Sequence, residues 1–240
     1  MQWWTILSCA ASVGPTSGSG EDPEVDTFET DGDVLRITFL GHGTLMLEYN
    51  RLCIHVDPVS SEADYANLPP ADLILITHHH HDHLDKEAVA QIHKNTTIIV
   101  LTEQASQDLL GGISMQNGTS CSMIGVEIEA VPAYNTTPDR TGYHPQGRDN
   151  GYVLTLGALR VYIAGDTEDI PEMRALKDID IAFLPMNLPY TMAPQQVAAA
   201  AKAFRPKVLY PYHYGETDPS ELVKLLQSEK DIEVRVRSLK

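Results

Sequence analysis

The sequence predicts a layered α/β fold in which two β-sheets pack face to face and helices cover the outside. Runs of β-forming residues outnumber segments with helical spacing. Helices alternate with strands only after a block of hairpins, and this order occurs in both halves of the chain. With 240 residues, 42% of them hydrophobic, the chain can form a sizeable core, so we expect one such domain over residues 33–240.

The first half opens with short runs of β-forming residues, which predict strands at 34–40, 44–49 and 52–56. A continuous apolar run at 72–77 predicts a strand that is buried on both faces. Residues 85–94 combine an acidic start with helical spacing, so we expect a helix capped by Asp85. This half ends with a predicted strand at 97–101 and a predicted helix, closed by glycine, at 103–112.

The second half resembles the first in its order of elements. A strand at 126–133 leads into a long polar loop, Tyr134 to Asn150, and a hairpin follows at 151–166. Helices and apolar strands then alternate to the end of the chain. The predicted helices cover 171–178, 193–204 and 219–227, and the predicted strands cover 179–185, 207–213 and 232–237.

The composition limits the classes of function. The chain has 17 Lys+Arg against 33 Asp+Glu, a formal net charge of -16, which argues against nucleic-acid binding because phosphate backbones recruit basic surfaces. Cys9, Cys53 and Cys121 are odd in number and show no CxxC spacing. Neither a disulfide framework nor a thiolate zinc site is therefore expected, and any metal must be bound by nitrogen and oxygen.

Residues 1–32 are predicted to be a flexible segment, because 12–26 is rich in Ser, Gly and acidic residues. A short apolar run precedes Cys9, as in a bacterial lipoprotein signal, but no Lys or Arg precedes that run. A cytoplasmic location is favoured, with export and a lipid anchor at Cys9 as the alternative. No apolar stretch approaches the roughly 20 residues that span a bilayer.

The most informative motif is THHHHDH, at the end of the predicted buried strand. His78, His80, Asp82 and His83 supply imidazole and carboxylate ligands from one short loop, a set that suits divalent metals. An internal histidine tag or an ordinary polar turn is the alternative. The histidine run is interrupted by Asp82 and follows a predicted buried strand, and both features favour a metal site over a tag or a turn.

With this His-x-His-x-Asp-His motif, the chain resembles the metallo-β-lactamase superfamily of metal-dependent hydrolases over residues 33–237. The resemblance implies an αββα sandwich and two divalent metal ions, zinc first, with manganese or iron as alternatives. In YIAGDTEDIPEM, Asp166 matches the carboxylate that bridges two metals. In YPYHYGETD, His213 matches the last histidine ligand. A shared carboxylate lowers the repulsion between two cations and fixes their spacing.

The remaining ligand of the first metal is open. Related hydrolases often have a histidine just after the strand that ends here in VPAYNTT, where this chain has Asn135. His144 follows in the same loop, and we expect it to be the third ligand. The alternative is that His144 packs against its loop neighbours while Asn135 or water completes the site.

Two upstream residues are expected to support the site. Asp57, in HVDP, matches a superfamily position behind the metal loop, where a carboxylate accepts the free ring N–H of a ligand histidine and fixes its tautomer. His42, in FLGHGTLMLEY, resembles the Gly-His of the ascorbate 6-phosphate lactonase-like branch, and we expect a catalytic role at the pocket. A turn histidine between two glycines is the alternative.

The resemblance implies hydrolysis by a metal-bound hydroxide that Asp82 helps to orient. Further motifs place the chain near the branch of ascorbate 6-phosphate lactonases and the phospholipase D that acts on N-acyl-phosphatidylethanolamine. That branch implies a small ester, lactone or phosphodiester substrate. The candidate substrate contacts are Asn135, Arg140, Arg148, Asn187 and Tyr190.

Three other functions compete with this interpretation. A non-catalytic metal-binding module would follow if Asn135 left the site incomplete. A metallo-nuclease is disfavoured by the net charge. A di-iron redox enzyme is disfavoured because no flavin domain is expected in this chain. The sequence predicts neither the oligomeric state nor which substrate is bound.

Overall fold

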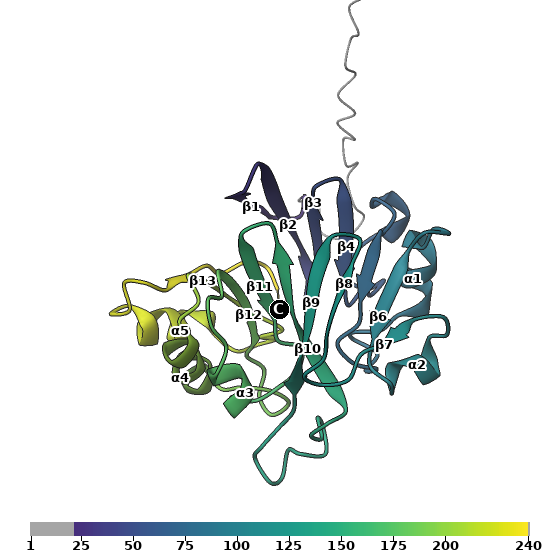
Figure 1. Ribbon diagram of the computed structural model, residues 1–240. Coiled ribbons are helices and arrows are strands. Elements are labelled where there is room, and N and C mark those ends of the chain that lie inside the picture. The colour runs from purple at the N-terminus through teal and green to yellow at the C-terminus, as the bar shows by residue number, and fades with distance from the viewer. Residues whose placement is uncertain (1–21, 240) are drawn as a thin grey trace, which may run out of the picture.

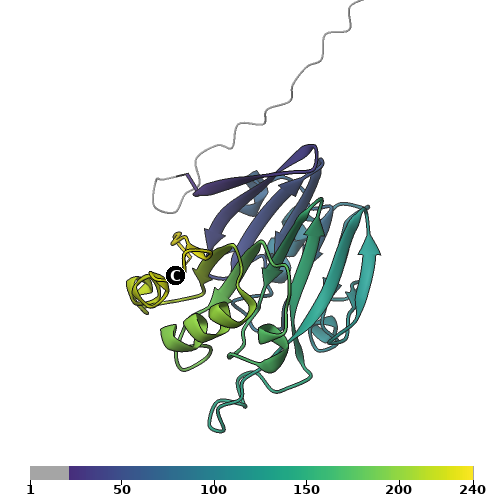
Figure 2. The same cartoon turned by 60° about the vertical axis from the view of Figure 1, so that its left-hand side comes forward.

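The computed structural model describes residues 22–239, which form two seven-stranded sheets packed face to face. α1 and α2 cover the first sheet, and α3 to α5 cover the second (Figures 1 and 2). The predicted αββα sandwich is confirmed. The proposed lipid anchor at Cys9 lies outside the described residues. Within 22–239, no helix is long and apolar enough to cross a membrane.

The first sheet contains β1 to β7 in chain order, with antiparallel pairing from β1 to β4 and parallel pairing from β4 to β7. Its strands are β1 Val25–Thr30, β2 Asp33–Gly41, β3 Thr44–Tyr49, β4 Leu52–Val56, β5 Leu73–Leu75, β6 Ile98–Leu101 and β7 Ile113–Ser114. Its helices are a 3-10 turn at Tyr65–Asn67, α1 Lys86–Ile92 and α2 Ala105–Asp108.

The second sheet repeats this plan, with an antiparallel block from β8 to β11 and parallel pairing from β11 to β14. Its strands are β8 Ser120–Met123, β9 Val126–Ala133, β10 Asp149–Leu156, β11 Leu159–Ile163, β12 Ile181–Pro185, β13 Val208–Tyr212 and β14 Glu233–Val234. Its helices are α3 Pro171–Arg174, α4 Pro194–Phe204 and α5 Pro219–Leu226.

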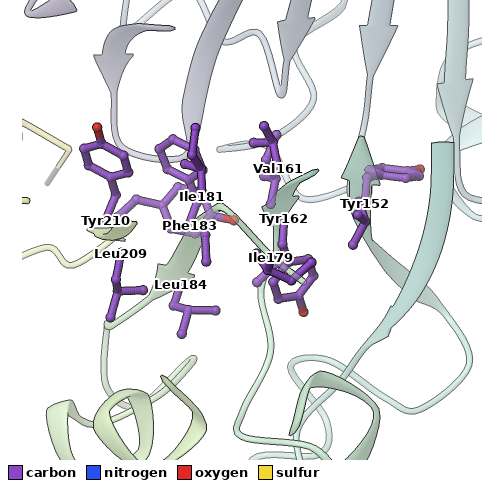
Figure 3. Packing of buried hydrophobic residues seen from close by; sticks show 14 of the residues in the cluster. Tyr152, Val161, Tyr162, Ile179, Ile181, Phe183, Leu184, Leu209 and Tyr210 are labelled. Atoms are coloured by element: carbon purple, nitrogen blue, oxygen red, sulfur yellow. The ribbon is translucent and has the colours of Figure 1, made fainter. Parts of the chain in front are cut away.

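The main core fills the space between the two sheets. In Figure 3, Phe183 of β12 and Tyr210 of β13 point toward the first sheet, whereas Leu209 and Tyr162 point toward the helices. The ring of Phe39 in β2 meets Tyr210 with 5.1 Å between centroids. This alternation follows from the period of two along a strand, and it explains why these strands read as continuous apolar runs.

The first strand lies inside the segment that the sequence predicts to be flexible. β1 pairs with β2 along its whole length. Asp26 in β1 also accepts hydrogen bonds from Arg235 and Arg237, near the other end of the chain. Tyr210 donates a further hydrogen bond to the same carboxylate. The predicted boundary at residue 32 is therefore wrong for Val25–Thr30, which form a hairpin with β2 and also bind residues remote in sequence through Asp26.

Shorter elements account for the other differences. α2 covers only part of the helix predicted at 103–112, and β14 covers only part of the strand predicted at 232–237. After β14, the Arg235 N–H still donates to the Leu209 carbonyl at 2.9 Å, and the side chains of Arg235 and Arg237 bind Asp26. β7 and β8 were not predicted, because runs of two and four residues are too short to show a period.

Candidate metal centre

The predicted site residues converge at one end of the sandwich, where the parallel strands have their carboxyl ends. The loop of His78 to His83 follows β5, Asp166 follows β11 and His213 follows β13. The long loop between β9 and β10, which carries His144, projects from the same end at the bottom of Figure 1. Strands far apart in sequence therefore deliver their polar residues to one place.

Two groups of ligands form there. His78, His80 and His144 each offer one nitrogen, and these atoms lie within 4.8 Å of one another. The second group offers its ligand atoms within the same distance and consists of His42, Asp82, His83 and His213. The structure thus places His144, and not Asn135, with the first two histidines of the motif.

Asp166 lies between the two groups. Its Oδ2 is 3.4 Å from Nε2 of His144 and 3.4 Å from Nε2 of His213. The same oxygen is 3.9 Å from His78 Nε2, and Oδ1 is 3.5 Å from His83 Nε2. One carboxylate therefore faces nitrogens of both groups.

The donor atoms fit a divalent cation. Within residues 22–239, His83 Nε2, Asp166 Oδ1 and both ring nitrogens of His213 are buried without a hydrogen-bond partner. An unpartnered buried polar atom costs about 1–3 kcal/mol, and the Nε2 atoms of His83 and His213 lie 3.5 and 3.4 Å from the Asp166 carboxylate. Imidazole nitrogen and carboxylate oxygen are the ligands that zinc, iron and manganese accept, so a bound cation would remove this penalty.

Asp57 orients two ligand histidines, one directly and one through Thr77. Its Oδ2 accepts a hydrogen bond from His83 Nδ1 at 2.8 Å and from Thr77 Oγ1 at 2.6 Å. Because the Thr77 hydroxyl hydrogen is used there, its oxygen accepts from His78 Nδ1 at 3.0 Å. This network assigns the proton to Nδ1 in both rings and leaves both Nε2 atoms for a metal. Thr77 was not predicted.

Asp149 gives His144 the same support. Its Oδ2 accepts from His144 Nδ1 at 3.1 Å, which directs Nε2 toward Asp166. Arg148 donates to both oxygens of Asp149, at 2.8 Å each. Arg148 is thus a partner of a buried carboxylate rather than the substrate contact that we predicted. Asp149 itself was missed because the strand that buries it begins two residues earlier than the sequence indicates.

Glu168 anchors the start of the same loop. This buried carboxylate accepts hydrogen bonds from the backbone N–H groups of Thr136 and Thr137 at 2.8 and 2.7 Å, and from Arg140 at 3.3 Å. Arg140 is therefore also engaged away from the pocket, contrary to its predicted role. Asn135 donates from its amide nitrogen to backbone oxygens, including that of Tyr190 at 2.7 Å, while its Oδ1 is buried without a hydrogen-bond partner, and the residue does not line the pocket over the two ligand groups.

His42 lies against the second ligand group. Its Nε2 is 3.3 Å from Asp82 Oδ2, and its ring centroid is 3.8 Å from that of His213. Its backbone, with φ of 46°, also accepts the His213 N–H at 3.1 Å. A side chain on Gly43 would place Cβ 2.8 Å from His83 Cε1, so only glycine permits this approach.

A pocket of about 410 Å³ opens over the two groups. Five of the candidate ligands line it, namely His80, Asp82, His144, Asp166 and His213. The remaining walls come from His81, Tyr143, Asn187 and Tyr190. Asn187 and Tyr190, two of the predicted substrate contacts, thus line the pocket. Tyr143 also lines it and was not predicted, although it is adjacent in sequence to His144.

The two groups differ in charge. Burial lowers the pKa of His78 well below its usual value and, with the charge of His144, lowers that of His80 to about 4. Burial also disfavours a charged His83, yet the carboxylates of Asp166 and Asp57 outweigh it and raise its pKa to about 9. Without a metal, protonated His83 therefore neutralises part of the buried negative charge.

These pKa shifts predict that metal binding displaces a proton from His83. Below pH 9 the metal-free ring is protonated, whereas His78 and His80 are already neutral. Metal affinity should rise with pH, roughly tenfold per unit near neutrality, and level off above pH 9. Calorimetry in buffers of different ionisation enthalpy should detect about one proton released per chain at pH 7. Release of no proton would contradict the assignment.

The same pKa predicts an effect on stability. Protonated His83 stabilises the metal-free fold fully below the unfolded pKa of about 6.5, and this stabilisation is lost as pH rises through the folded pKa of about 9. The melting temperature of the metal-free protein should fall over that interval, and the metal-loaded protein should show no such fall.

Replacement of His144 by alanine should lower the metal content by up to one equivalent, because the first group keeps only two of its nitrogens. His93→Ala is the matched control, since His93 is exposed and follows α1. Elemental analysis of both variants provides the measurement. Unchanged occupancy in His144→Ala would assign the third position to solvent or to another residue.

Known proteins match the chain over most of its length. The family model described as a beta-lactamase superfamily domain matches residues 36–213. A UPF0173 metal-dependent hydrolase of Thermus thermophilus is 31% identical over 195 residues, which cover 78% of this chain and 86% of the relative. Among solved structures, one from Parabacteroides distasonis, named as a metal-dependent hydrolase, is 55% identical with a TM-score of 0.89 and covers 91% of this chain and all of its own. A metallo hydrolase from Ignicoccus hospitalis is 25% identical with a TM-score of 0.69, covering 84% and 94%.

Proposed function

The chain belongs to the beta-lactamase superfamily and, within it, to the UPF0173 metal-dependent hydrolases; from this premise we propose that it hydrolyses a small ester, lactone or phosphodiester at a binuclear site. His78, His80 and His144 would bind one cation, and Asp82, His83 and His213 the other. Asp166 would bridge them. Zinc is the first candidate, with manganese or iron as alternatives that the same ligands accept.

The position of Asp166 carries this proposal. It is almost fully buried, with 3% of its surface exposed, and it faces nitrogens of both ligand groups. Burial alone would raise its pKa, but His213 and His83 keep it below the usual value, so the carboxylate is ionised. An ionised buried carboxylate that faces imidazoles on both sides can bind two cations at once. It therefore suits a binuclear site better than a site for a single cation.

Bound divalent cations would supply Lewis acidity and a water acidified toward neutral pH. The chain's own residues arrange the rest. Asp82 is partly exposed at the pocket. Burial alone would raise its pKa, but the neighbouring His213, with Nε2 3.5 Å from Oδ2, and the hydrogen bond from His42 keep it low. Its carboxylate can therefore accept a hydrogen bond from an attacking water and orient it, while His42 holds the carboxylate in place.

Within the superfamily, we propose a relation to the ascorbate 6-phosphate lactonase-like branch, which the Gly-His at residues 41–42 supports. His42 lies in the second ligand group, with Nε2 3.3 Å from Asp82 Oδ2, although it does not line the 410 Å³ pocket. The non-catalytic alternative depended on an incomplete first group. Because His144 lies in that group, the main argument for a non-catalytic protein no longer applies.

Metal content and turnover test the proposal together. Protein purified without a histidine tag should contain about two equivalents of metal by elemental analysis, and it should hydrolyse a generic lactone or a generic phosphodiester. At most one equivalent with no turnover, even after reloading with zinc or manganese, would favour a metal-binding protein without hydrolase activity.

A further inference from the structure

One wall of the pocket is aromatic and contains none of the proposed metal ligands. Tyr143, in the loop before His144, and Tyr190, after β12, approach each other with ring centroids 5.0 Å apart and planes at 73°. Both rings are exposed, at 39% and 45% of their surface, and both line the 410 Å³ pocket. Asn187 completes this side. Exposed aromatic pairs at a pocket mouth provide flat apolar surface with polar edges.

The backbone of this aromatic pair is fixed from behind. The Tyr143 carbonyl accepts from Arg148 Nη2 at 2.7 Å, and the Tyr190 carbonyl accepts from Asn135 Nδ2 at 2.7 Å. Asn135 is buried, and Arg148 is itself paired with buried Asp149. The backbone that carries the two rings is therefore held in place before any ligand arrives, which reduces the entropy that binding must offset.

Positive charge is absent from this wall. Among the residues that the structure describes, the pocket lining includes neither lysine nor arginine. The two arginines of the neighbouring loop are engaged, Arg140 with Glu168 and Arg148 with Asp149. The formal net charge of -16 adds a repulsive field for anions. Apart from the metal ions that we propose, a substrate with a charged phosphate or carboxylate away from its reacting bond would find no counter-charge on this wall.

We infer that Tyr143 and Tyr190 form a subsite for a neutral, flat aromatic group, so the substrate is an uncharged ester or lactone that carries an aryl ring. This inference rests on the proposed hydrolase function. Of the three proposed substrate classes it keeps the ester and the lactone and excludes the charged phosphodiester. A pocket of 410 Å³ lies near the lower end of the roughly 300–1,000 Å³ typical of small-ligand sites, which suits one ring beside the reacting group.

Matched substrates test the charge preference. The metal-loaded protein is assayed with methyl 4-acetoxybenzoate and with 4-acetoxybenzoate, which carry the same acetyl ester and differ in a distal charge. We expect kcat/KM to favour the neutral ester by roughly tenfold, since an unpaired like charge is repelled. Equal or faster hydrolysis of the carboxylate would overturn the inference.

Variants test the aromatic subsite, with the non-aromatic δ-valerolactone as reference. In Tyr190→Ala, kcat/KM for methyl 4-acetoxybenzoate relative to δ-valerolactone should fall roughly tenfold, mainly through KM. Tyr190→Phe keeps the ring and should keep the ratio. An unchanged ratio in Tyr190→Ala, at unchanged metal content, would overturn the subsite.

The non-hydrolysable methyl 4-acetamidobenzoate separates this inference from the proposed function. If no ester is hydrolysed, the function fails, and calorimetry with this amide and its carboxylate form still tests the subsite. Tighter binding of the neutral amide, weakened in Tyr190→Ala, would support the subsite without the hydrolase. Hydrolysis without ring or charge preference would retain the hydrolase and reject the subsite.

Discussion

Replacement of Asp166 by asparagine should abolish binuclear metal loading and lower the rate of hydrolysis by about a thousandfold or more, while the fold remains intact. The amide keeps the shape of the side chain but loses the charge that faces both ligand groups. A metal centre contributes several kcal/mol to transition-state stabilisation, and about 4 kcal/mol corresponds to three orders of magnitude in rate. Elemental analysis and steady-state kinetics on the same preparation provide the measurement.

Asp31→Asn is the control for this experiment. It makes the same chemical change at an exposed turn between β1 and β2, far in sequence from the ligands. It should retain full metal content and activity. Circular dichroism should show that both variants are folded. An Asp166→Asn protein with full metal content and retained activity would exclude the bridging role.

Local patterns were sufficient to predict the sandwich and most of the ligand set. The buried strands of the second half are continuous apolar runs, and α1 begins after the predicted cap, with Asp85 accepting from Glu87 N at 2.8 Å. His78 and its neighbours are adjacent in sequence, so one loop suffices to recognise them. These features depend on residues that are close together along the chain.

The features that the sequence could not predict depend on remote partners. The Asp26 carboxylate of β1 binds Arg235 and Arg237, and the Arg148 side chain binds Asp149. The presence of an arginine near a site does not reveal whether its charge is already paired, because the pairing depends on burial of the partner. Arg140 and Arg148, which we predicted as substrate contacts, are paired with Glu168 and Asp149, and this pairing leads to the inference of a neutral substrate.

The hydrogen bonds of Thr77 and Asp57 behind the proposed metal site were only partly predictable from the sequence. Asp57 was expected to orient one histidine, but it reaches a second through the Thr77 hydroxyl. The two ligand groups are therefore coupled behind the site by one carboxylate. Loss of this carboxylate should affect both cations, whereas loss of the hydroxyl should affect mainly the one bound by His78.

Replacement of Asp57 by asparagine should accordingly weaken metal binding about 10- to 100-fold and lower hydrolysis with it. The amide can accept from only one side, and its NH2 would face the His83 or Thr77 donor in a fully buried place. An unsatisfied buried donor costs about 1–3 kcal/mol, so the free energy of unfolding should also fall by that amount. Thr77→Val is the matched comparison, because it keeps the bond from His83 and removes only the relay to His78. Metal titration of the folded variants distinguishes the two: an Asp57→Asn protein with the affinity of Thr77→Val would mean that the direct bond to His83 does not orient a ligand.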